Sequence, residues 1–232
     1  MFCVNCGSAM DRAVAACPTC GNSNQPSLSG ADVSRIIKEA STDALGAIRH
    51  VAVDPVAGLP SAFETLGERR GRSAGVAFGV GFALLATIAS LIAASKIGTG
   101  GTFKLLLAVF IVGLVPFAAI AATSAAARKV FRTNGTLGAD LFTAGVALQP
   151  LGFLLVLAAV LGINNYQAIL LLSLFAWTYT LCILFTGSTR LSSIPERFAP
   201  PVLAVMLFAA MWLTKLVAGS FLDSGPLGRF FG

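Results

Sequence analysis

Two pairs of cysteines at the start of the chain have the spacing of a zinc site. Two residues separate the cysteines within each pair, and ten residues separate the pairs. Two such pairs can close around one Zn²⁺ in tetrahedral geometry, with zinc–sulfur distances of about 2.3 Å. Gly7 and Gly21 directly follow the pairs, and a residue without a Cβ lets backbone N–H groups point at the sulfurs. We therefore predict a zinc ribbon over residues 1–21. Its predicted ligands are Cys3, Cys6, Cys17 and Cys20.

The composition of this ribbon favours a structural zinc site over a catalytic one. Four thiolates would leave no open position for water, and the ribbon contains no Glu or His that would act as a base. A redox dithiol pair is the alternative interpretation of the same spacing. Residues 1–20 lack the basic start and apolar core of a signal peptide, so we expect reduced cysteines in the cytosol. Because the sequence shows no catalytic constellation elsewhere, we expect a protein that is not an enzyme.

The rest of the chain has the composition of a membrane protein. The sequence is 56% hydrophobic and only 11% charged, whereas soluble domains carry about a quarter charged residues. A domain of residues 74–221 contains five apolar runs of about 20 residues, the length that crosses a bilayer as a helix. The runs are 74–95, 104–126, 139–161, 168–187 and 201–221. The predicted fold is an all-α polytopic membrane protein with five transmembrane helices and a small N-terminal zinc ribbon.

Three shorter segments complete the predicted organisation. Residues 22–30 are rich in Ser and Asn, and this composition predicts a flexible linker. The segment 31–73 begins with an amphipathic helix at 32–51, which Pro55 and Pro60 follow, and it ends in a basic collar. Residues 222–232 form the tail. The helix leaves an apolar face that needs a protein or a membrane surface to cover it.

The loop charges predict the orientation of the five spans. Counting Lys and Arg in the loops and the collar, eight lie on the side of the N-terminus and three on the opposite side. Basic loops stay in the cytosol, so we expect the N-terminus in the cytosol and the C-terminus outside, in the cytoplasmic membrane. The net charge of +6 lies entirely in residues 74–232, because residues 1–73 hold seven basic and seven acidic side chains. Nucleic acid is therefore an unlikely partner for the ribbon.

Several residues of the apolar runs have expected packing roles. Gly75 and Gly79 form a GxxxG spacing, which favours close helix packing over a dimerisation signal. Gln149 is expected to satisfy a carbonyl that Pro150 frees, although a functional polar site is the alternative. Three residues in the middle of the fourth run are expected to pack between helices: Trp177, Thr178 and Tyr179.

Two segments resemble known families. The opening FCVNCGSAM…CPTCG resembles the short zinc ribbon at the head of many bacterial membrane proteins, with Val4 where proline is frequent. The segment 134–150, an apolar run that ends in Leu-Gln-Pro, and the loop 189–191 are similar to the YIP family of five-span membrane proteins. That resemblance implies a cytosolic N-terminus and a membrane scaffold. The acidic signatures of the eukaryotic members, which act in vesicle trafficking with small GTPases, are not visible in this sequence.

These observations favour a non-enzymatic membrane scaffold or adaptor. Its expected partners are the lipid bilayer and a protein that binds the cytosolic ribbon and the helix 32–51, and a homo-oligomer is compatible with the sequence. The alternative is a channel or a lipid or small-molecule transporter built on the five-span bundle. A nucleic-acid or regulatory sensor tethered to the membrane is a third hypothesis, which the neutral charge of residues 1–73 disfavours.

Overall fold

A computed structural model describes residues 51, 54–97, 103–162 and 165–223. The predicted zinc ribbon, the linker, nearly all of the amphipathic helix and the end of the tail lie outside these residues. Zinc binding and the helix 32–51 therefore stay predictions. Val51, the last residue of that predicted helix, is helical and buried.

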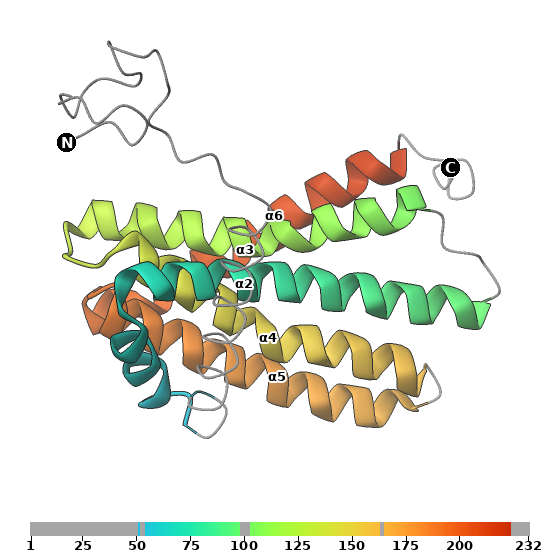
Figure 1. Ribbon diagram of the computed structural model, residues 1–232, viewed down its shortest axis with the longest axis horizontal. Coiled ribbons are helices and arrows are strands. Elements are labelled where there is room, and N and C mark those ends of the chain that lie inside the picture. Colours follow the sequence, from blue (N-terminus) through green and yellow to red (C-terminus); the bar gives the residue numbers. More distant parts are fainter. Residues whose placement is uncertain (1–50, 52–53, 98–102, 163–164, 224–232) are drawn as a thin grey trace, which may run out of the picture. The chain divides into compact units, whose positions relative to one another are not determined.

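Five long helices make up most of the described chain (Figure 1). Within the described residues, each is long and apolar enough to cross a membrane, with mean hydropathy between 2.0 and 2.7. The prediction of a five-span, multi-pass integral membrane protein is confirmed at this level. The helices are α2 (Gly58–Ile97), α3 (Phe103–Phe131), α4 (Leu137–Leu161), α5 (Tyr166–Thr186) and α6 (Ala199–Asp223).

The first helix is longer than the apolar run predicted for it. Helix α2 begins at Gly58, and the basic collar is itself helical except at Gly67, whose φ of 70° kinks the helix. The early start follows from apolar side chains before the run. Leu59 and Ala62 are buried, and the ring of Phe63 lies 5.5 Å from the ring of Phe142 in α4. Burial of these side chains stabilises a helix in the segment before residue 74, where the sequence predicted a basic collar outside the first span.

Helices α2 and α4 form the most extensive contact of the bundle, and α6 lies against α3 (Figure 1). Glycines allow the close approach of α2 and α4. A Cβ added to Gly145 would lie 2.3 Å from the carbonyl oxygen of Gly75, and one added to Gly75 would lie 2.5 Å from the Phe142 nitrogen. A Cβ on Gly79 would lie 2.6 Å from the ring of Phe117 in α3. The Gly75–Gly79 spacing therefore serves packing within the chain, as expected.

The middle of α5 differs from the prediction. Trp177 is 39% exposed and Thr178 is also exposed, so neither packs between helices. Only Tyr179 is partly buried, and its hydroxyl donates a hydrogen bond to the Val51 carbonyl oxygen. The reason is the helical period: Ala176, Thr180 and Ile183 are the inward residues of α5, which leaves positions 177 and 178 facing out.

Candidate functional site

A buried carboxylate at one end of the bundle is the most distinctive polar feature of the described residues. Asp140 lies in the first turn of α4 and its side chain is 0% exposed. Thr136 caps this helix, because its hydroxyl accepts from the Ala139 N–H at 3.2 Å. An acidic residue in the first turn also interacts favourably with the helix dipole. The local sequence thus places the Asp140 carboxylate at the start of α4.

Helix α3 brings two partners to Asp140 from its last turns. Ser124 and Arg128 are four residues apart and therefore share one helix face. Arg132, with a φ of 51°, ends α3, and the Thr133 N–H donates to the Arg128 carbonyl oxygen at 3.1 Å. The short turn that follows folds α4 back against α3. The antiparallel pair therefore sets the Ser124–Arg128 face beside the first turn of α4.

A third element reaches the same carboxylate from the end of α5. Helix α5 continues into the π-helix η2 (Gly187–Leu191), after which Ser192 leaves the helical path. The Ser192 N–H donates to the Gly187 carbonyl oxygen at 2.9 Å, and the Thr133 hydroxyl donates to the Ser192 carbonyl oxygen at 2.7 Å. Ser192 is thus held by η2 and by the α3–α4 turn. A π-turn shifts the register of the residues that follow it, and such turns often occur at functional positions.

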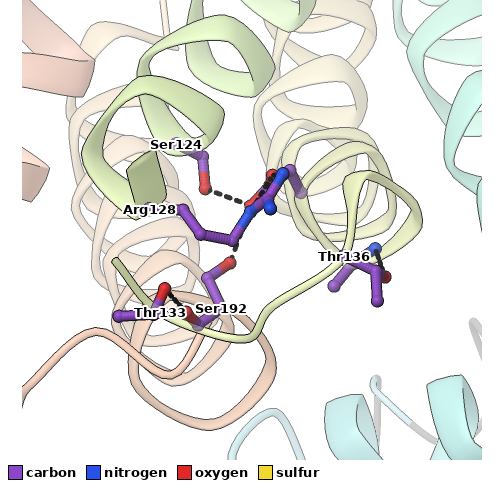
Figure 2. Close-up of polar contacts among 7 residues, drawn as sticks. Ser124, Arg128, Thr133, Thr136 and Ser192 are labelled. Atoms are coloured by element: carbon purple, nitrogen blue, oxygen red, sulfur yellow. Dashed lines mark hydrogen bonds and ion pairs between the residues drawn. The ribbon is translucent and has the colours of Figure 1, made fainter. Parts of the chain in front are cut away.

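Both oxygens of the Asp140 carboxylate are fully used by these partners (Figure 2). Oδ1 accepts from the Ser124 hydroxyl at 2.7 Å and from the Ser192 hydroxyl at 2.8 Å. Oδ2 accepts from Nε of Arg128 at 3.0 Å and lies 3.0 Å from one of its terminal nitrogens. We call these residues, Asp140, Arg128, Ser124, Ser192 and Thr133, the Asp140 cluster. It joins α3, α4 and the end of η2 through one carboxylate.

The arrangement of charges in the Asp140 cluster favours a structural role. The Arg128 guanidinium neutralises the carboxylate, and two hydroxyls occupy its other oxygen, so no lone pair faces an empty site. In the part of the chain that the structure describes, no group of three His, Cys, Asp or Glu side chains is placed to hold a metal ion. A buried ion pair of this kind contributes little net stability. Its contacts here link α3, α4 and the residue after η2 through one carboxylate.

Two buried hydroxyls next to the Asp140 cluster have no hydrogen-bond partner within the described residues. They belong to Thr143, one turn after Asp140 in α4, and to Ser188 in η2. A Cβ on Gly187 would lie 2.1 Å from Thr143, so only glycine allows η2 to approach α4 here. This approach buries the Thr143 side chain against η2.

Gln149 and Tyr179 line a cavity of about 240 Å³ between α4 and α5. The side-chain amide of Gln149 donates to the Phe78 carbonyl oxygen at 2.7 Å and to the Gly145 carbonyl oxygen at 3.2 Å. Neither acceptor is the Val146 carbonyl, which is the one that Pro150 frees four residues earlier. The amide instead links α4 to α2, so Gln149 has a packing role of a different kind from the one expected.

Sequence reasoning missed the Asp140 cluster. Arg128 was one of the eight basic residues counted on the side of the N-terminus, and Asp140 is the second residue of the predicted run 139–161, at the mouth of that span. The two were not paired. The sequence did contain one indication of the pair: Arg128 and Asp140 are twelve residues apart on either side of a turn. Such a turn brings the end of one helix beside the start of the next. The contribution of Ser192, 52 residues beyond Asp140, had no comparable signal.

The predicted zinc ligands Cys3, Cys6, Cys17 and Cys20 lie outside the described residues, so the structure does not show whether they converge. The cysteine that is described, Cys182 in α5, is a partly buried free thiol. It offers a matched control for the ribbon cysteines.

Purified full-length protein is expected to carry one zinc ion per chain, and Cys3→Ser or Cys17→Ser is expected to release it. Three thiolates and a hydroxyl bind Zn²⁺ far less tightly than four thiolates, and so short a segment depends on its metal to fold. Elemental analysis of the protein measures the zinc content. Cys182→Ser should keep the full amount, and intact protein without metal would contradict the zinc ribbon.

The fold and the Asp140 cluster define a class: a multi-pass helical membrane protein whose helix ends are fastened by a buried ion pair. No family model, curated protein or solved structure matches the chain. The resemblance to zinc-ribbon membrane proteins and to the YIP family therefore stays a hypothesis from the sequence.

Proposed function

We propose that this protein is a non-enzymatic scaffold or adaptor of the cytoplasmic membrane. The five-span bundle anchors the chain, and the zinc ribbon and the helix 32–51 bind a protein partner in the cytosol. The Asp140 cluster is the observation that carries the proposal. An ionisable group within a membrane span is by default a candidate for transport or proton transfer. Here the carboxylate is paired and fully hydrogen-bonded, so it fastens helices to one another.

The placement of the Asp140 cluster also fits an anchor. It lies where α3 ends and α4 begins, at the same end of the bundle as the start of α2 (Figure 1). The loop charges assign this end to the cytosol. A bundle that is rigid at its cytosolic end would give the zinc ribbon and the helix 32–51, which precede α2 in the sequence, a fixed point of attachment. The YIP-like resemblance implies the same orientation.

Cross-linking in intact membranes tests the adaptor role. We expect at least one protein that cross-links to the wild-type chain, that is lost with Cys17→Ser and that is retained with Cys182→Ser. The two variants make the same chemical change, but only the first removes a predicted zinc ligand. An identical set of partners for the wild type and for Cys17→Ser would contradict the proposal.

The cavity beside Gln149 favours a second candidate, a channel or lipid transporter that uses the bundle as a path. Reconstituted vesicles distinguish the two functions. A transporter would carry lipid or a small molecule across the bilayer and would lose that activity with Gln149→Leu. An adaptor would show no such flux in either form.

A further inference from the structure

A groove runs between α5 and α6, where the bundle is open on one side. Helix α6 packs along α3 and scarcely touches α5 (Figure 1). The space left between α5 and α6 has a volume of about 670 Å³. Leu181 and Phe185, on its α5 wall, are each 40% exposed, so the groove is open along the α5 side. Its apolar lining includes Leu181, Cys182, Phe185, Leu203, Ala204 and Leu207. Val56, which precedes α2, and Pro200 also line it.

One end of the same groove is charged. Arg190 of η2 and Glu196, the first residue of the 3₁₀ helix η3 (Glu196–Phe198), both line it. Both side chains are exposed, and among the described residues neither makes a hydrogen bond or an ion pair. The hydroxyl of Thr189 already donates to the Phe185 carbonyl oxygen at 2.9 Å. A ligand at this end would therefore meet one free cation and one free anion.

The combination of an apolar groove with two opposite charges at its mouth fits a zwitterionic phospholipid. An acyl chain that enters the groove leaves one apolar environment for another, so selection among lipids must come from the head group. A guanidinium binds phosphate through several N–H donors, and a carboxylate binds a primary ammonium through N–H···O bonds. A quaternary ammonium has no N–H to donate, and an anionic glycerol head group would leave Glu196 without a counter-charge.

We propose that the groove between α5 and α6 binds one phosphatidylethanolamine molecule, with its phosphate on Arg190, its ammonium on Glu196 and an acyl chain between the helices. This lipid would complete the open side of the bundle. The charged end of the groove lies beside η2, which contains Arg190. The residue after η2 is Ser192, a member of the Asp140 cluster. The head group would thus lie in the leaflet at that end of the bundle. The lipid site is independent of the adaptor role, since neither requires the other.

Native mass spectrometry of the delipidated full-length protein tests the lipid site. Phosphatidylethanolamine, phosphatidylcholine and phosphatidylglycerol with the same acyl chains are added in turn. We expect phosphatidylethanolamine to bind about tenfold more tightly than the other two, the size of effect that one charge-assisted contact provides. Equal binding of the three lipids would overturn the proposal.

Variants assign the binding to the groove. Arg190→Gln is expected to weaken phosphatidylethanolamine binding about tenfold, through loss of the contact to phosphate. Glu196→Gln should remove the preference for the primary ammonium over phosphatidylcholine. Ala204→Trp should block the acyl chain while it leaves both charges in place. Arg197→Gln is the matched control, because the Arg197 guanidinium lies over the Phe198 ring, 4.6 Å from its centroid, and Arg197 does not line the groove.

Each variant is first checked for a monodisperse, helical protein in detergent. If Arg190→Gln does not fold, Glu196→Gln and Ala204→Trp decide the question. Unchanged lipid selectivity in Glu196→Gln together with unchanged lipid affinity in Ala204→Trp would overturn the proposal. So would an Arg197→Gln variant that weakens binding as much as Arg190→Gln does.

Discussion

Arg128→Met is expected to lower the free energy of unfolding by about 3–5 kcal/mol, the cost of leaving a buried charge without its partner. The side chain of Asp140 is 0% exposed and that of Arg128 is 18% exposed. Removal of the guanidinium would therefore leave the Asp140 carboxylate unpaired in a place that water cannot reach. Methionine keeps the length of the apolar stem, so the loss reports the charge more than the packing.

Asp140→Asn is expected to lower the free energy of unfolding by less, about 1–3 kcal/mol, which is the penalty of one imperfectly paired buried group. The asparagine carbonyl oxygen can still accept from Ser124 and Ser192. Arg128, which is partly exposed, can turn toward water. The double variant Arg128→Met/Asp140→Asn contains no buried charge, so it should be more stable than Arg128→Met alone.

The three variants form a double-mutant cycle whose readout is the unfolding free energy in mixed detergent micelles, followed by circular dichroism. The matched control is Lys129→Met, the same type of change at an exposed neighbour in α3, which should stay within about 0.5 kcal/mol of the wild type. A double variant as unstable as the sum of its single variants would show that Arg128 and Asp140 are not coupled.

Gly145→Ala is the second substitution with a large expected effect, a loss of about 3 kcal/mol or more in unfolding free energy. The added Cβ would lie 2.3 Å from the Gly75 carbonyl oxygen and 2.8 Å from Cβ of Phe78. The nearer atom is backbone and cannot rotate away, so α2 and α4 must move apart along their most extensive contact. Alanine is otherwise the better helix former, by about 1 kcal/mol.

The same substitution at Gly219 in α6 is the control. A Cβ there meets nothing within 4 Å, so Gly219→Ala should leave stability unchanged or raise it slightly. The difference in unfolding free energy between the two variants isolates the steric term from helix propensity. If Gly145→Ala and Gly219→Ala proved equally stable, the close crossing of α2 and α4 would be contradicted.

The five spans could be predicted from the sequence because membrane insertion depends on the hydropathy summed over a whole helix. Runs of about 20 apolar residues report the thickness of the hydrocarbon core, whatever the neighbours of each residue. Their boundaries were less predictable. Helix α2 begins at Gly58 because Leu59 and Phe63 pack against the bundle, a gain that a hydropathy count does not contain. The prediction that Trp177 packs between helices was wrong, because the helical period turns Ala176, Thr180 and Ile183 inward and leaves position 177 exposed.

The zinc ribbon is a prediction that rests on the sequence alone, because metal ligation requires particular residue types at short, local spacings. Cys3, Cys6, Cys17 and Cys20 meet that requirement by themselves, and their zinc content can be measured directly. The Asp140 cluster and the groove between α5 and α6 emerge only from the tertiary structure. Each depends on residues from different helices, such as Ser192 beside Asp140, whose meeting is set by how the helices pack and by the π-turn of η2.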